Sequence, residues 1–216
     1  MTPTPAQVTA VCVVHAIKPG HFHETAIDKR PRTARLRVDE AGLAGDEQRD
    51  RHHGGPDAAV YVYADEEAAF FAETLGGTPR PGLFGENLRT SGLDVSGARI
   101  GERWLVGDVL LEVRGPRTPC PNLSLHVGVP GFHRELHRSG RVGAMCRVLR
   151  PGEVEPGLPV VVDHVPDHGV TVADLSAGPS ASAARELRDS GVDLAPRVRR
   201  LVLRRAAADP KGSGNR

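Results

Sequence analysis

Short runs of β-branched and aliphatic residues, separated by glycine and proline, are the main pattern along this chain. Seven runs have the length and composition of strands: Val8–His15, Ala34–Val38, Ala59–Tyr63, Arg103–Val106, Val109–Val113, Val142–Leu149 and Val160–Val165. The 25 glycines and 18 prolines supply the tight turns that join such strands. The pattern predicts a fold that is mainly β with some α.

Helical patterns are fewer and become frequent only near the C-terminus. Ala64–Leu75 begins with three acidic residues, which favour a helix N-terminus, and it stops before two glycines. Phe132–Arg138 follows a Pro-Gly pair, and Ser180–Asp189 and Leu194–Ala208 have the Arg, Ala and Leu patterning of helices. We therefore expect a β domain over residues 1–168, a helical appendage over residues 169–208 and a disordered tail over residues 209–216.

Charge and cysteine content exclude several classes of protein. With 28 basic and 27 acidic residues in 216, the net charge of +1 creates no general attraction to nucleic acid or anionic membranes, so stable nucleic-acid binding is not expected. The three cysteines form no Cys-x-x-Cys pair, which fits a reducing compartment and argues against disulfides, structural zinc and iron–sulfur clusters. The N-terminal residues lack a signal-peptide pattern, and no run of eighteen apolar residues occurs. The sequence predicts a cytoplasmic protein.

Basic side chains gather in the predicted appendage, which contains Arg197, Arg199, Arg200, Arg204 and Arg205. They suit a docking surface for an acidic partner, and they equally suit a solvated helix face. The sequence leaves both interpretations open.

Cys120 is the strongest candidate for chemistry. It lies in Arg114-Gly-Pro-Arg-Thr-Pro-Cys-Pro121, directly after a predicted strand, where three prolines fix the backbone. Arg114 and Arg117 are close in sequence, and positive charge favours the thiolate, which is a nucleophile and a soft-metal ligand. The alternative is a small apolar cysteine at a loop edge.

A glycine-rich stretch over residues 42–60 is the second candidate. Its glycines, including Gly54 and Gly55, allow positive φ and close approach of the backbone to a ligand. Asp46, His53 and Asp57 could hydrogen-bond a polar ring, although each also suits an ordinary turn or surface position.

Two shorter segments complete the set of candidates. Ala26–Pro31 is interpreted as a basic loop before a strand, in which Lys29 either holds a phosphate or faces solvent. Asn87 places an amide directly after the turn at Gly85.

Other known site types are not supported by the residues. Adjacent histidines at 52 and 53 on an extended loop point to opposite sides and do not readily share one zinc ion. The sequence has neither the Gly-x-Ser-x-Gly motif of many hydrolases nor a phosphate-binding Gly-x-x-x-x-Gly-Lys-Ser/Thr loop.

Taken in chain order, five motifs resemble the MOSC family, named for the C-terminal domain of molybdenum cofactor sulfurase, and within it the bacterial YiiM-type members. The motifs are Ala-Ile-Asp-Lys, Gly-Leu-Ala-Gly-Asp-Glu-Gln, His-Gly-Gly-Pro-Asp, Phe-Gly-Glu-Asn-Leu and Pro-Arg-Thr-Pro-Cys. The resemblance covers roughly residues 8–165 and extends less securely into the helical end. It implies a MOSC-type β-barrel, related to that of pyruvate kinase, with short helices and a three-helix appendage of which this chain has a shorter form.

The resemblance also implies a bound molybdenum cofactor (molybdopterin). Cys120 is then the sulfur ligand to molybdenum or a persulfide carrier. The candidates for binding the anionic end of the cofactor are Lys29, His53 and Arg117. The candidates for pterin contacts, or for supporting the loops that make them, are Asp46, Asp57 and Asn87. The binding loop includes Gly54 and Gly55.

Three functions follow from this resemblance and the residues. The first is an oxidoreductase that reduces N-hydroxylated compounds, such as hydroxylamino nucleobases, with a separate flavin or iron–sulfur protein as electron donor. The second is a carrier in which Cys120 passes sulfur or the cofactor to another enzyme. The third is a β-rich binding scaffold without activity.

Overall fold

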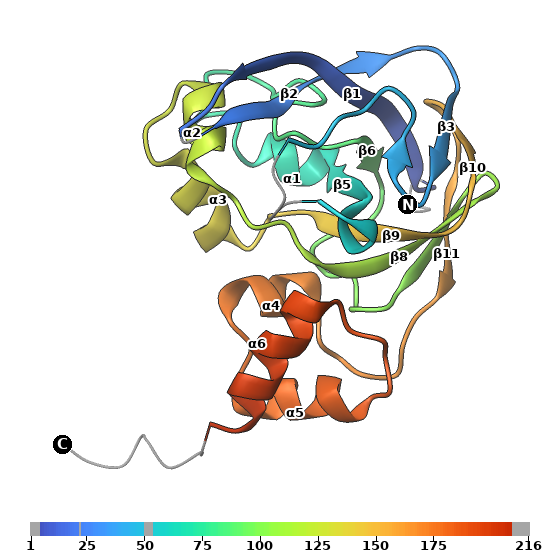
Figure 1. Cartoon of the computed structure of the whole chain (residues 1–216), viewed down its shortest axis with the longest axis vertical. Helices are drawn as coiled ribbons and strands as arrows, with labels where there is room; N and C mark the ends of the chain where they lie inside the picture. Colours follow the sequence, from blue (N-terminus) through green and yellow to red (C-terminus); the bar gives the residue numbers. More distant parts are fainter. Residues whose placement is uncertain (1–4, 22, 50–53, 209–216) are drawn as a thin grey trace.

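The structure is a computed structural model that describes residues 5–21, 23–49 and 54–208. A large sheet, a three-stranded sheet and short helices make up these residues (Figure 1). The large sheet has the order β11-β7-β8-β9-β5-β6-β1-β2, and all its neighbours are antiparallel except β5 and β6. Its strands are β1 (Gln7–Pro19), β2 (Glu24–Arg32), β5 (Val60–Ala64), β6 (Leu88–Ser91), β7 (Arg103–Val106), β8 (Val109–Pro116), β9 (Ala144–Arg150) and β11 (Val160–His164). The small sheet has the order β10 (Gly152–Val154), β3 (Leu36–Asp39) and β4 (Gly42–Leu43).

The large sheet curls towards a barrel but is not closed by a continuous ladder. The first part of β1 pairs with β6, and its later part pairs with β2. Near residue 8, β1 also meets the segment before β11: the Val8 N–H donates to the Leu158 carbonyl at 2.9 Å, and the Gly157 N–H donates to the Val8 carbonyl at 2.7 Å. The expected mainly β, barrel-like fold is confirmed, with an open sheet.

The prediction of a basic loop over Ala26–Pro31 is wrong, because these residues lie within β2. Their charges are compensated inside the fold: Asp28 accepts from Lys18 at 2.7 Å and from Arg30 at 3.1 Å. A strand can therefore carry a charged sequence that would otherwise favour a solvated loop. The strand brings Lys29 to a wall of the candidate site described below.

The helices are short. They are η1 (Pro56–Ala58), α1 (Asp65–Ala69), α2 (Pro121–Val127), α3 (Phe132–Ser139), α4 (Val172–Ala177), α5 (Ala181–Asp189) and α6 (Pro196–Ala206). The helix expected over Ala64–Leu75 ends at residue 69, because the N–H groups of Phe71 and Ala72 bond carbonyls three residues earlier and the chain continues as turns. The described residues include no helix with the length and apolarity needed to cross a membrane.

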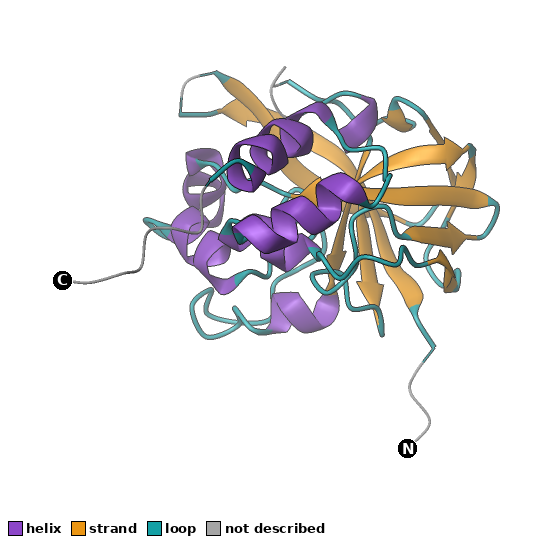
Figure 2. Cartoon of the chain, turned by 90° about the horizontal axis from the view of Figure 1, so that it is seen from below, coloured by secondary structure: helices purple, strands orange, loops and turns teal. Residues whose placement is uncertain are grey.

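Helices α4, α5 and α6 follow the last strand and lie beneath β8 and β9 in the view of Figure 1, and α4 contacts β8. Seen from below, helices lie in front of the strands (Figure 2). Ionic contacts help to fix them there: Asp193, in the α5–α6 loop, accepts from Arg114 of β8 at 3.1 Å and from Arg147 of β9 at 2.9 Å. The predicted tail over residues 209–216 lies outside the described residues.

Candidate functional site

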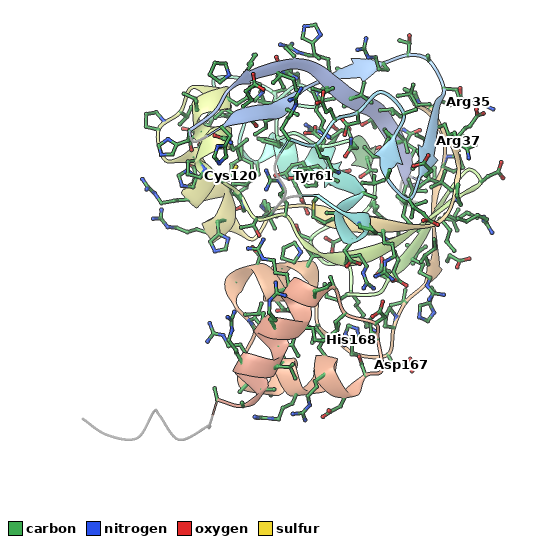
Figure 3. All side chains as sticks on the ribbon, in the orientation of Figure 1. Arg35, Arg37, Tyr61, Cys120, Asp167 and His168 are labelled. Atoms are coloured by element: carbon green, nitrogen blue, oxygen red, sulfur yellow. The ribbon has the colours of Figure 1, made fainter. Side chains whose placement is uncertain are left out.

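An open cavity beside Cys120 collects side chains from distant parts of the sequence. With the open space at its mouth, it has a volume of about 870 Å³. We call it the thiol cleft, and its walls include Lys29, Tyr61, Asn87, Arg117, Cys120 and Asn122. Figure 3 labels Cys120 and Tyr61, which come from the start of α2 and from β5.

Cys120 is the residue that directly precedes α2. The strand β8 ends at Pro116, and Pro121 then occupies the first turn of α2, where its fixed φ suits a helix start. Cys120 itself has extended backbone angles (φ −120°, ψ 164°), and it is partly exposed. The predicted turn after a strand is therefore present, and it opens a helix that the sequence reading missed.

The other two cysteines are buried, as expected for core residues. Burial raises the pKa of Cys12 to about 12, and burial likewise raises that of Cys146. Of the three cysteines, all of which the structure describes, Cys120 is the one that lines the thiol cleft. It is therefore the thiol available to a ligand.

Lys29 is held at the cleft wall by Asp46. The Lys29 Nζ donates to Asp46 Oδ2 at 2.6 Å, and only 9% and 6% of the two side chains are exposed. The same oxygen accepts from Asn87 Nδ2 at 2.8 Å, and the other carboxylate oxygen accepts from the Val14 N–H at 3.0 Å. Asp46 thus positions two cleft residues, and the charge of Lys29 is already balanced.

Asn87 is built into the sheet as well as the cleft. Its backbone bonds Tyr61 and Cys12, and its side chain bonds the same two residues: Oδ1 accepts from the Tyr61 N–H at 3.1 Å, and Nδ2 donates to the Cys12 carbonyl at 3.3 Å. This fixes the orientation of the amide. The polar group expected here is present and rigid.

Arg117 is the cleft cation without a carboxylate partner among the described residues. Its guanidinium lies 5.8 Å from the centre of the Tyr61 ring, and one of its amino groups donates to the Thr118 carbonyl. Its backbone N–H donates to the Gly143 carbonyl at 3.2 Å. The Tyr61 hydroxyl donates to the carbonyl of Val142, the residue before Gly143, at 2.9 Å. The Tyr61 side chain therefore contacts the Arg117 guanidinium with its ring and, through its hydroxyl, holds the segment that bonds the Arg117 backbone.

The remaining predicted residues lie elsewhere. Gly54, Gly55 and Asp57 line a neighbouring cavity that also contains Arg117. Asp57 Oδ1 accepts from Arg114 at 2.8 Å and from Arg147 at 2.6 Å, so its carboxylate is committed to the scaffold. Arg114 lines that second cavity too, and not the thiol cleft. His53 lies outside the described residues.

Several cleft residues escaped sequence reasoning. Tyr61 and Met145 belong to apolar strands, whose pattern indicates core, and Asn122 lies in the helix that was not predicted. The Asn122 amide oxygen accepts from the His21 N–H at 2.6 Å, which ties α2 to the turn before β2. The one available signal was Pro121, because proline is common in the first turn of a helix.

Chemically, the cleft offers one thiol, a fixed amide and charged side chains of both signs, since Glu24, Glu47 and Arg49 also line it. Among the described residues, no three His, Cys, Asp or Glu side chains are grouped to hold a metal ion. A metal at Cys120 would therefore bring most of its ligands with it. An anionic polar heterocycle that carries a soft metal fits this set of donors.

A curled β-sheet with a partly exposed cysteine in a polar cleft, followed by three helices, defines a class of domain. The MOSC domain model matches residues 49–161, and the chain belongs to the MOSC domain family. The chain is similar to YiiM from Escherichia coli (34% identity over 158 residues, 71% of this chain and 70% of YiiM) and to YflK from Bacillus subtilis (36% over 139 residues, 64% and 63%).

Two further similarities concern a solved structure and a longer protein. The crystal structure of YiiM from Geobacillus stearothermophilus superposes with a TM-score of 0.77 at 25% identity, over 94% of this chain and all of that one. A protein of Gibberella moniliformis named as a reductase is 34% identical over 140 residues, which is 62% of this chain and 24% of that protein. The resemblance seen in the sequence to the YiiM type is confirmed.

Proposed function

We propose that this protein binds the molybdenum cofactor with Cys120 as its sulfur ligand, and that it reduces N-hydroxylated compounds. The observation that carries the proposal is the position of the one cleft thiol, which shares its cavity with Lys29, Asn87 and Arg117. Membership of the MOSC family and the similarity to a reductase support it. The cofactor, when bound, supplies two-electron redox chemistry at molybdenum.

The residues of the cleft divide the work of binding. The Cys120 thiolate is a soft ligand suited to molybdenum. Arg117 has guanidinium N–H groups available for a phosphate, which arginine binds in a bidentate manner. Lys29 is already neutralised by Asp46, so it offers hydrogen bonds more than uncompensated charge, and Asn87 presents a fixed amide to the pterin.

The proposed reaction cleaves the N–O bond of the substrate. Two electrons and two protons convert the N-hydroxyl compound to its amine and one water molecule. The electrons come from a separate flavin or iron–sulfur protein, because this chain has three cysteines, fewer than a four-cysteine cluster requires. The cleft must therefore admit a small substrate next to Cys120.

The test measures molybdenum by elemental analysis in the purified wild type and in Cys120→Ser. Cys146→Ala is the matched control, since it removes a thiol from the core and leaves the cleft intact. We expect molybdenum in the wild type and the control, and its loss from Cys120→Ser. The loaded wild type, supplied with a competent reductase, should reduce a hydroxylamino purine.

Two results would contradict the proposal. If the wild type and Cys120→Ser contain equal amounts of molybdenum per protein, the Cys120 thiol is not the ligand. A persulfide on Cys120, detected by mass spectrometry as one added sulfur in cells unable to make pterin, supports instead a sulfur carrier.

A further inference from the structure

A second cavity adjoins the thiol cleft. We call it the arginine cleft: it has a volume of about 850 Å³ including its mouth, and its lining includes Gly55, Asp57, Arg114, Arg117, Arg197 and Arg200. Ala58, Arg117 and Met145 line both cavities. A ligand that reaches Cys120 is therefore close to a second set of groups, part of which belongs to α6.

The arginine cleft carries positive charge that the fold does not neutralise. Arg197 and Arg200, like Arg117, form no ion pair with any carboxylate in the described part of the chain. Among the described residues of the lining, Asp57 is the one acidic residue, and its carboxylate is shared by Arg114 and Arg147. Arg197 and Arg200, which are exposed at the cavity edge, thus face it without a counter-charge, a favourable setting for an anion.

These arginines lie along one side of α6. Positions 197, 200 and 204 are three and four residues apart, the spacing of neighbours on a helix face, and Arg204 continues the row into a third cavity that Arg117 and Arg197 also line. Arg199 and Arg205 belong to the same helix but line neither cavity. Arg199 and Arg205 can therefore serve as matched controls for the arginines of α6 that line a cavity.

Apart from Thr118, the rest of the described lining is apolar or glycine and includes Pro116, Met145, Ala195 and Val198. Val198 packs near Gly115, where a β-carbon would lie 3.0 Å from a Val198 methyl group, so the absence of a side chain lets α6 approach β8 closely. An apolar wall beside unpaired guanidinium groups suits a planar ring or sugar that carries a phosphate.

We propose that the arginine cleft binds the phosphate of the substrate, so that the preferred substrates are N-hydroxylated nucleotides and not free bases. This inference rests on the proposed function, and it goes further by naming the substrate class. The base would extend towards Cys120, and its phosphate would be held by Arg197 and Arg200. Arg117, which lines both cavities, lies between the two parts of the ligand.

The experiment compares three molybdenum-loaded proteins: the wild type, Arg197→Gln/Arg200→Gln, and Arg199→Gln/Arg205→Gln, which loses the same charge outside the cleft. Titration calorimetry with adenosine 5′-monophosphate and with adenosine measures the contribution of the phosphate without turnover. We expect the wild type to prefer the monophosphate by about tenfold or more, as charge-assisted hydrogen bonds allow. The first double variant should lose this preference, and the control should keep it.

Turnover gives a second readout. With hydroxylaminopurine and its ribonucleoside 5′-monophosphate as substrates, kcat/KM for the nucleotide should fall about tenfold or more in Arg197→Gln/Arg200→Gln while that for the base is unchanged. Equal binding of both ligands by the wild type overturns the inference, as does an equal loss in both double variants. A loss of molybdenum confined to the first variant also overturns it, because the arginines would then bind the phosphate of the cofactor. If no N-hydroxylated compound is reduced but the monophosphate preference persists, the proposed reaction fails and the phosphate site remains.

Discussion

Replacing Asp46 by asparagine should destabilise the fold strongly for so small a change. One carboxylate oxygen accepts from both Lys29 and Asn87, and the other accepts from the Val14 N–H. An asparagine amide has one acceptor and one donor end, so in either orientation its NH₂ group faces a donor. The substitution also leaves the buried Lys29 ammonium without its counter-charge.

The expected magnitude follows from the burial of this pair. Removing one partner of a buried ion pair costs about 3–5 kcal/mol. For a chain of this length each kcal/mol lowers Tm by about 2–4 °C, so the melting temperature should fall by about 6–20 °C. Thermal and urea denaturation measure the effect, and Asp163→Asn, at an exposed position on β11, should stay within about 0.5 kcal/mol of wild type.

A double variant tests the reasoning further. Adding Lys29→Met to Asp46→Asn removes the unpaired ammonium, so the double variant should be less destabilised than the sum of the two single variants. If Asp46→Asn melts within about 2 °C of wild type, the buried pair does not hold the cleft wall together in the way described. Strict additivity would lead to the same conclusion.

Three further outcomes are expected. In folded protein prepared without the cofactor, a maleimide should modify Cys120 alone, as peptide mass spectrometry would show. Fast labelling of Cys12 or Cys146 would contradict their burial. Gly143→Ala should lower the free energy of unfolding by about 3 kcal/mol, because Gly143 has a positive φ and its added β-carbon would lie 2.6 Å from a strand carbonyl. Gly128 also has a positive φ but open space around it, so Gly128→Ala should lower that free energy by about 1 kcal/mol. Similar losses in the two variants would show that the strand carbonyl does not crowd position 143. Burial raises the pKa of Glu67 above its ordinary 4.5, so the charged carboxylate destabilises the fold at a pH above the raised pKa, and this penalty disappears as the pH falls. In urea titrations the wild type should therefore gain stability relative to Glu67→Gln between pH 7 and pH 4. A difference in stability that does not change with pH would contradict the raised pKa.

The sequence alone was enough for the strands that obey the simple pattern. Arg103–Val106 was predicted with the observed bounds, and the runs at Val109–Val113 and Val160–Val165 lie within or next to observed strands. These segments are rich in β-branched and aliphatic residues, and their burial follows from their composition. Cys12 and Cys146 lie within two of the predicted apolar runs, and both are buried.

What the sequence could not supply is pairing at long range. β2 was missed because its charges are satisfied by partners elsewhere: Lys29 meets Asp46, and Asp28 meets Lys18 and Arg80. Only the folded chain brings these groups together, so local composition favoured a loop. The shared carboxylate of Asp57 is another case, because Arg147 lies 90 residues further along the chain.

The candidate site was predicted unevenly for a related reason. Cys120 was identified from its proline-rich turn and from the family resemblance, and Lys29, Asn87 and Arg117 came with it; the structure brings these four together. Their roles as ligands remain predictions. Tyr61 was hidden because an aromatic residue in an apolar strand has the same local pattern whether it supports a cleft or fills a core.

The double attachment of Asn87 affects how variants at this position are interpreted. Its amide substitutes for a main-chain link between β5 and β1, so shortening it to alanine would loosen the junction of two strands as well as empty a place in the cleft. If Asn87→Ala were purified without molybdenum, the result would not distinguish the loss of a contact to the pterin from a loss of pairing between the strands. Aspartate at the same place keeps the acceptor for the Tyr61 N–H, but it sets a second carboxylate beside Asp46 and an acceptor against the Cys12 carbonyl, so it would weaken the same junction by repulsion.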